Sequence, residues 1–118
     1  MTASRWHAAD RELRSAAATA RRIGAPLVLV LLPRPEQLYS IRLRGGFARV
    51  AKSAEQAGIL VVDPAPLLAE DHDRVGLFLF PADHHPSPRC YARIAQIAAQ
   101  ALTTTGIVPT SVTRRERR

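Results

Sequence analysis

Two short apolar runs with an amphipathic stretch between them constrain the fold of this chain more than any other feature. Residues 26–32 and 59–62 are rich in leucine and β-branched side chains, which is typical of strands buried in a parallel sheet. Between them, apolar side chains recur every three or four positions over residues 47–57, which predicts a helix. A strand, a helix and a second strand of these lengths form a right-handed crossover. We therefore expect the two strands to pair in parallel.

A helix is expected on either side of this strand–helix–strand unit. Residues 5–23 place apolar side chains at intervals of three and four, with arginines on the other face. Residues 88–103 repeat the pattern, and Ser87 followed by Pro88 is a preferred pair for the start of a helix. On this last helix the predicted core-facing side chains are Tyr91, Ile94, Ala95, Ala98, Ala101 and Leu102. Each helix should pack on the sheet through its apolar face.

These elements are too few for a closed α/β domain, because a parallel sheet has both faces covered and usually four or more strands. Residues 75–80 would add either a third strand or an extended lead-in to the next loop. We therefore predict an α/β fold, a three-layer α/β/α fragment with a short parallel sheet. Residues 1–104 would form this partial domain and residues 105–118 a basic, disordered tail. One edge of the sheet should be open, with apolar side chains available for self-association.

Composition excludes several classes of protein. The chain has 118 residues, of which 47% are hydrophobic and 23% charged, the balance of a folded rather than a disordered protein. No apolar run approaches the roughly 20 residues of a membrane-spanning helix. No secretory signal is visible, so we expect a cytoplasmic chain without a membrane span. The single cysteine, Cys90, excludes a disulfide framework and a cysteine zinc cluster.

The net charge of +7 does not by itself predict a nucleic-acid partner. All but one of the 17 basic residues are arginine, and four of them lie among the last five residues. A nucleic-acid-binding protein usually carries its charge on one face, and aromatic residues make up only 5% of this chain. We interpret the abundance of arginine, alanine and proline as the bias of a GC-rich bacterial genome. No nucleic-acid partner is expected.

The candidate catalytic residues lie in residues 81–88, Pro-Ala-Asp-His-His-Pro-Ser-Pro. In extended backbone Asp83 and His85 point to the same side, and His84 points to the other. A carboxylate at that spacing reaches the imidazole, fixes its tautomer and stabilises its protonated form, as in the acid–base half of a Ser-His-Asp triad. The loop precedes a helix N-terminus, where α/β folds place their ligands. The alternative is that both residues only make turns and caps in a polar loop.

Other reactive side chains are interpreted as structural. Asp71, His72 and Asp73 form a second acidic and histidine cluster, expected in a solvent-exposed loop. Cys90 lies in the first turn of the last helix, where the helix dipole could lower its pKa, but a packed core residue is the favoured interpretation. The chain contains no Gly-x-Ser-x-Gly, no Gly-Asp-Ser and no phosphate-binding glycine loop. We therefore expect no activated nucleophile, no metal and no cofactor.

The order of these segments resembles the C-terminal half of the SGNH hydrolase superfamily, also called GDSL-type esterases and lipases. The resemblance covers residues 6–102. Its most specific part is the block LFLFPADHHPSPRCYARIAQIAAQAL, whereas GAPLVLVLLPRPEQ and AGILVVDPAPLL are generic α/β segments. It implies a flavodoxin-like fold in which Asp83 and His85 are the triad acid and base. It also implies hydrolysis or transfer of ester or O-acetyl groups, with a small ester or an acetylated glycan as substrate.

Three features depart from the family pattern. The common Asp-x-x-His spacing would need an aspartate at position 82, where this chain has Ala82, so only the Asp-x-His variant of some branches fits, including relatives of polysaccharide O-acetyltransferases. Cys90 stands where the family has a glycine. The Gly-Asp-Ser block with its nucleophilic serine and the oxyanion donors are absent. The chain is therefore expected to be truncated and inactive alone.

Two alternatives stay open. The first is a small non-catalytic α/β interaction module or a remnant of a hydrolase. The second, less favoured, is a metal-dependent phosphoesterase, which the Asp-His-His sequence at residues 83–85 superficially matches. Such sites need further aspartates on earlier strands to hold two metals. Asp63 could be one of them, but no Asp-x-Asp block precedes it.

Overall fold

The computed structural model describes residues 2–40, 42–79 and 81–108. Its elements are, in chain order, α1 (Ala3–Arg22), β1 (Val28–Val30), α2 (Pro35–Tyr39), η1 (Arg42–Arg44), α3 (Gly45–Gln56), β2 (Leu60–Val62), α4 (Ala65–Ala69), η2 (Val75–Leu77) and α5 (Pro88–Thr104), where η denotes a 3-10 helix. The three predicted helices are confirmed as α1, α3 and α5. The predicted tail lies outside the described residues from residue 109 onward.

The predicted parallel pairing of the two apolar runs is confirmed. Val28 of β1 lies opposite Leu60 of β2, and the register continues to Val30 opposite Val62. α3 joins the two strands, as a crossover connection requires. In the part of the chain that the structure describes, the sheet contains these two strands, so the protein is a mixed α/β structure with a high helix content.

The strands are shorter and more exposed than the apolar runs predicted. β1 has three residues, and all three are half-buried rather than buried. Leu32, just beyond β1, is 50% exposed. The physical reason is the width of the sheet, because each of two strands has an outer edge that no described strand covers.

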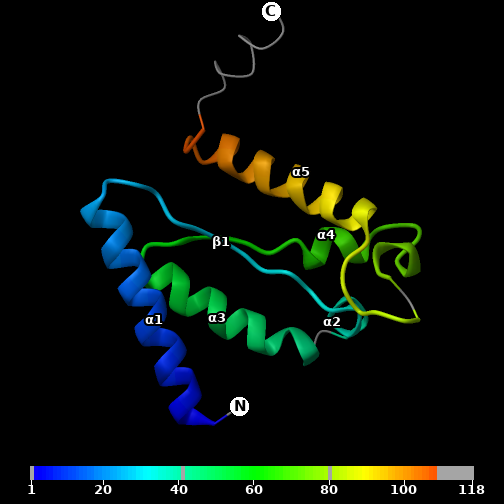
Figure 1. Cartoon of the computed structure of the whole chain (residues 1–118), viewed down its shortest axis with the longest axis horizontal. Helices are drawn as coiled ribbons and strands as arrows, with labels where there is room; N and C mark the ends of the chain where they lie inside the picture. Colours follow the sequence, from blue (N-terminus) through cyan, green and yellow to red (C-terminus); the bar gives the residue numbers. More distant parts are fainter. Residues whose placement is uncertain (1, 41, 80, 109–118) are drawn as a thin grey trace, which may run out of the picture.

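Apolar side chains pack in two clusters, one against each face of the strand pair. Successive strand side chains point to opposite faces, so Val28 and Val30 contact the first cluster while Leu27 and Leu29 contact the second. The first cluster consists of Leu38, Val62, Ala65, Leu68, Leu77, Phe78, Cys90, Ile94 and Ile97, and the second of Ala17, Ala54 and Ile59. Figure 1 shows α5 on one side of the strands, with α1 and α3 on the other.

The face by which α5 packs overlaps the predicted one only in part: Ile94, Ala98 and Ala101 contact the first cluster as predicted, whereas Tyr91 and Ala95 are exposed. Cys90, Ile94 and Ile97 are its buried residues, whereas Tyr91 is 47% exposed. These three positions follow the spacing of four and three that one helix face requires. Because Cys90 is fully buried in the first cluster, the helix is rotated so that its neighbour Tyr91 faces outward.

The segment before α5 is not a third strand within the described residues. Residues 75–77 form η2, and Phe78 then makes an isolated antiparallel bridge to Pro86. This bridge closes a loop whose two ends lie side by side. Among the described residues, no helix is both long enough and apolar enough to span a membrane.

Candidate active site

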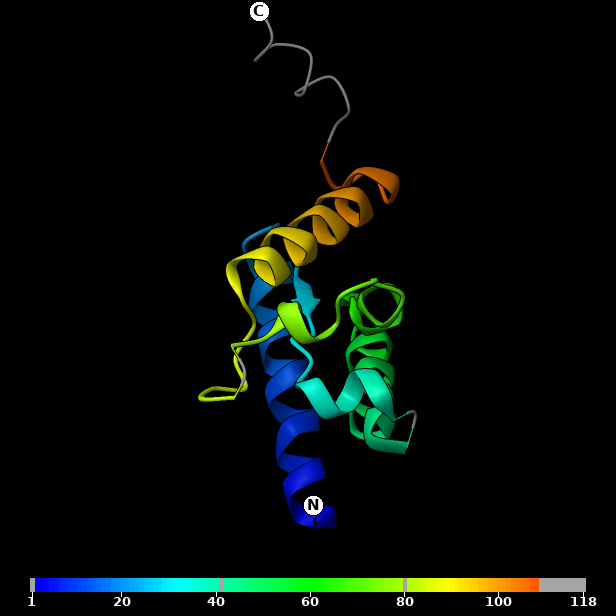
Figure 2. The same cartoon turned by 90° about the vertical axis from the view of Figure 1, so that its right-hand side faces the viewer.

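The Asp-His-His segment lies in a loop at the carboxyl ends of the two strands. β1 leads into α2 and β2 leads into α4, so both helices mark that end of the sheet. His84 of the loop contacts Glu36 of α2, which places the loop there as predicted. Figure 2 shows this end of the molecule, with the yellow-green loop projecting from the body below the start of α5.

The predicted contact between Asp83 and His85 is present. Oδ1 of Asp83 accepts a hydrogen bond from the backbone N–H of His85 at 3.0 Å and also contacts Nδ1 of the His85 ring. A carboxylate on Nδ1 places a proton there, so in the neutral ring Nε2 is the basic nitrogen. The backbone hydrogen bond, followed by the ring hydrogen bond, holds the pKa of Asp83 below its ordinary value. Asp83 is therefore ionised at neutral pH.

The dyad faces solvent. The side chain of His85 is 76% exposed and that of Asp83 is 45% exposed. Within the described residues, the hydrogen bonds of His85 are its backbone bonds and the Nδ1 contact, which leaves Nε2 open. Such a nitrogen can accept a proton from a group that another molecule or another polypeptide segment brings to it.

His84 points away from the dyad, as predicted, and contacts a residue that sequence reasoning did not identify. Its Nδ1 lies 3.1 Å from Oε1 of Glu36 in the first turn of α2. The hydrogen bond from the residue's own backbone N–H, assisted by Arg34 and His84, lowers the pKa of Glu36. No local pattern pointed to this pair, because its members lie 48 positions apart.

The two nucleophile candidates beside the dyad are engaged elsewhere. Ser87 caps α5 as predicted, accepting from the backbone N–H of Cys90 at 3.3 Å, and it donates to the carbonyl of Gly76 at 2.7 Å. Cys90 is fully buried, as expected of a core residue, and burial raises the pKa of its thiol. In the described ranges, none of the hydrogen bonds to His85 comes from a hydroxyl or thiol.

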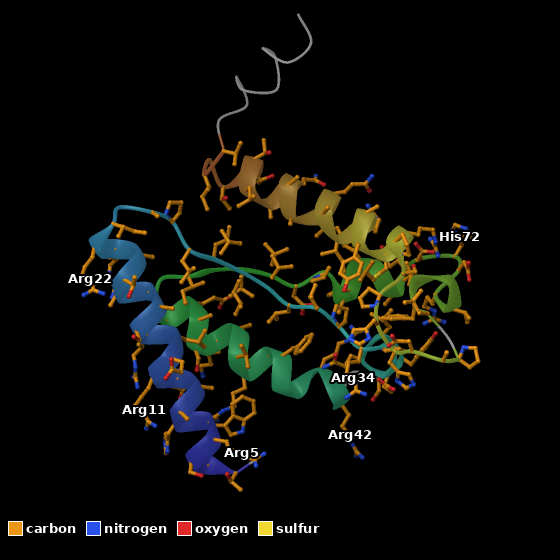
Figure 3. All side chains as sticks on the ribbon, in the orientation of Figure 1. Arg5, Arg11, Arg22, Arg34, Arg42 and His72 are labelled. Atoms are coloured by element: carbon orange, nitrogen blue, oxygen red, sulfur yellow. The ribbon has the colours of Figure 1, made fainter. Side chains whose placement is uncertain are left out.

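The second acidic and histidine cluster, residues 71–73, is partly bonded to α5 instead of facing solvent throughout. The prediction is wrong for Asp71, whose side chain is only 12% exposed and accepts from Arg89 of α5 at 3.0 and 3.1 Å. Arg89 also donates to the backbone carbonyl of Asp73 at 2.5 Å. The backbone N–H of Asp73, followed by Arg89, lowers the pKa of Asp71. His72 is 92% exposed and points outward, as Figure 3 shows.

A separate polar hollow of about 160 Å³ lies between α1 and α3, away from the dyad. Its polar lining residues are Asp10, Arg14, Ser53 and Gln56. Ser53 donates a hydrogen bond of 2.5 Å to Asp10, a contact between two helices that sequence periodicity did not indicate. Because the Asp10 carboxylate bonds to a serine and not to a histidine, the hollow does not contain an acid–base pair like that of Asp83 and His85.

The remaining polar side chains bear on the metal-dependent alternative and on where the positive charge lies. Asp63 accepts a hydrogen bond from the backbone N–H of Ala65 at 3.0 Å, in the turn that precedes α4. Within the described residues, no three histidine, cysteine or carboxylate side chains are grouped so as to hold a metal ion. Arg11 and Arg22 of α1 project into solvent on the side away from the strands (Figure 3).

Comparison with known protein families, with curated proteins and with solved structures found no match. The functional argument therefore depends on the geometry of the loop that carries Asp83 and His85.

Proposed function

We propose that Asp83 and His85 are the acid and base of a serine-dependent ester hydrolase, and that this chain supplies that half of the triad. The observation that carries the proposal is the double use of Oδ1 of Asp83, which contacts both the backbone N–H and the ring Nδ1 of His85. A carboxylate in this position orients the imidazole and stabilises its protonated form. The nucleophilic serine and the oxyanion donors would come from polypeptide outside the described residues.

The chemistry assigned to each residue follows from the hydrogen bonds. Nε2 of His85 would take the proton of a serine hydroxyl as the serine oxygen attacks the carbonyl carbon of the ester. The resulting imidazolium would then give that proton to the departing alkoxide. Asp83 stays ionised throughout, because its pKa is lowered, and its charge stabilises the imidazolium. The substrate class follows from the resemblance to GDSL-type esterases, which implies a small ester or an O-acetyl group carried on a glycan.

The proposal includes a wider sheet, so that the chain is a fragment of a three-layer α/β/α domain of the SGNH type. Its support is the combination of half-buried strands with apolar clusters packed against both strand faces. The missing neighbour would be a strand-bearing segment with the Gly-Asp-Ser block. In its absence a second copy of the chain would cover the open edge by self-association.

The chain alone should not hydrolyse esters. A triad that has lost one member retains activity only through its oxyanion hole and binding cleft, and neither is assigned to this chain. With p-nitrophenyl acetate, the rate should equal that of buffer containing imidazole at the same concentration. Turnover by the parent chain that a His85→Ala substitution abolishes would contradict the half-triad account, because it would require a nucleophile within the chain.

The positive test restores the missing half. The DNA upstream of the Met1 codon is searched for a frame that encodes Gly-Asp-Ser, and its product is mixed with the purified chain. Ester hydrolysis should appear and should be lost in Asp83→Asn and His85→Ala. His72→Ala is the matched control, because His72 is also exposed and lies 3.7 Å from an aspartate.

Two results would count against the hydrolase proposal. The first is a product that binds the chain without producing ester hydrolysis. The second is the lack of any such frame, which would favour the non-catalytic module. Loss of hydrolysis in the His72→Ala control as well would show that the assay does not report on the dyad.

A further inference from the structure

The loop that carries the dyad is closed by hydrogen bonds within its own segment. The backbone N–H of Leu79 donates to the carbonyl of His85 at 3.0 Å, and that of Asp83 donates to the carbonyl of Leu79 at 2.9 Å. At the base of the loop, Phe78 bridges to Pro86. The base is also held to the body of the protein, because the backbone N–H of Ser87 donates to the carbonyl of Leu77 at 2.8 Å and Phe78 is buried in the first apolar cluster. None of these bonds involves the side chain of His84.

The contact between His84 and Glu36 joins the loop to the body of the protein. Their ring nitrogen and carboxylate oxygen are 3.1 Å apart, and the two side chains are 46% and 45% exposed. His84 lies between the two members of the dyad in sequence. Because residues 83–85 are consecutive, the contact of His84 with Glu36 is one residue away from each member of the dyad.

Glu36 is carried by a firmly anchored helical turn. Leu38 of α2 is buried in the first apolar cluster, and the side chain of Gln37 accepts from the backbone N–H of Arg34 at 2.7 Å. At the other end of α2, the guanidinium of Arg44 donates to the carbonyls of Gln37 at 2.6 Å and Leu38 at 3.0 Å. Glu36 is therefore a fixed point, and the loop is the part that it can position.

We propose that Glu36 is a positioning residue for the dyad and acts through His84. Its carboxylate holds the loop in the conformation in which the N–H groups of residue 85 converge on Asp83. The relevance of this contact to catalysis rests on the proposed function, but the contact and its effect on Asp83 do not.

The direction in which the pKa of Asp83 changes when Glu36 is removed distinguishes two roles for Glu36. Glu36 faces Arg34, 3.8 Å away, and His84, while Asp83 faces His85. If Glu36 acted only through its negative charge, its removal would favour the ionised form of Asp83 and lower the pKa of Asp83 further. If Glu36 positions the loop, its removal weakens the hydrogen bonds to Asp83, and the pKa of Asp83 rises toward its ordinary value.

The experiment is an NMR titration of the 13C-labelled Asp83 carboxyl carbon in the full chain. We expect Glu36→Gln to raise the pKa of Asp83 while the chain stays folded, because the Glu36 side chain is 45% exposed and belongs to neither apolar cluster. Glu70→Gln, which changes another exposed carboxylate at the end of α4, should leave the Asp83 titration as it is in the parent.

A His84→Gln background supplies the second arm. There, adding Glu36→Gln should produce no further rise in the pKa of Asp83, because the connection is already broken. An unchanged or lowered pKa in Glu36→Gln, or an equal additional rise in the His84→Gln background, would overturn the proposal. Neither result depends on ester hydrolysis, so a failure here is distinguishable from a failure of the proposed function.

Discussion

At the scale of single residues, Gly76 shows how tightly the segment before α5 is packed. A β-carbon added there would lie 2.3 Å from Oδ2 of Asp73 and 3.3 Å from a guanidinium nitrogen of Arg89. Asp73 also accepts a hydrogen bond of 3.0 Å from the backbone N–H of Gly76. A side chain at position 76 would therefore push the Asp73 carboxylate away from the backbone N–H of residue 76 and from the guanidinium of Arg89.

Gly76→Ala should lower the free energy of unfolding by about 1 kcal/mol, because the half-exposed Asp73 carboxylate moves aside and its hydrogen bond to the backbone of residue 76 is lost. Urea unfolding followed by circular dichroism measures the change. Gly46→Ala is the matched control, because no atom lies within 4 Å of a β-carbon added in that first turn of α3. Alanine favours a helix more than glycine does, so the control should be neutral or stabilising. Equal losses in both variants would contradict this account of Gly76.

At the scale of elements, the short helix α4 contributes more to the core than its five residues suggest. Leu68 is fully buried in the first apolar cluster, together with Leu38 of α2. Its neighbour Leu67 is 44% exposed. The two leucines differ in environment and not in chemistry, so they separate the effect of burial from that of residue type.

Leu68→Ala should lower the free energy of unfolding by about 2–5 kcal/mol, because truncation leaves a cavity in the cluster. Leu67→Ala should cost less than about 1 kcal/mol, since much of that side chain already contacts water. Both values come from urea unfolding of the full chain. Similar losses in the two variants would show that α4 does not pack as described.

At the scale of the whole molecule, acid should destabilise the fold. The pKa values of Glu36, Asp71 and Asp83 are all lowered, chiefly by backbone hydrogen bonds. Between the lowered value and the ordinary value near 4, the unfolded chain binds more protons than the folded chain, so stability rises with pH there. The contribution is complete above the ordinary value and is lost as the pH falls through the lowered one.

Unfolding monitored from pH 7 to pH 2 should therefore show a constant contribution from these groups until about pH 5 and then a loss. Asp71→Asn should reduce the slope of stability against pH in the acid range, because one of the three linked carboxyls is gone. A slope equal to that of the parent would contradict the assignment for Asp71.

The open sheet edge leads to a second prediction for the whole molecule. Sedimentation velocity should show association that increases with concentration, and Leu32→Glu should weaken it because Leu32 is half exposed beside β1. Ile23→Glu is the control, since Ile23 is 73% exposed but follows α1, away from the paired region of the strands. A monomer at all concentrations would exclude self-association through this edge.

The sequence by itself determined the features whose partners lie a few residues apart. Ser87 and Pro88 begin α5 because a cap and the first turn of a helix are local structures. Asp83 and His85 meet because an aspartate side chain reaches a backbone N–H and a ring two positions away. The parallel pairing of β1 and β2 was also predictable, since a helical crossover leaves few other topologies.

Only the tertiary structure decided which distant segments meet and which helix face is covered. Glu36 contacts His84 across 48 positions and Asp71 contacts Arg89 across 18, and charged residues at such separations carry no local signal. Periodicity predicted an apolar face on α5, but two overlapping faces satisfy the same spacing. The burial of Cys90 selects between them and exposes Tyr91, because packing against the strands and η2, rather than helix propensity, sets the rotation of a helix.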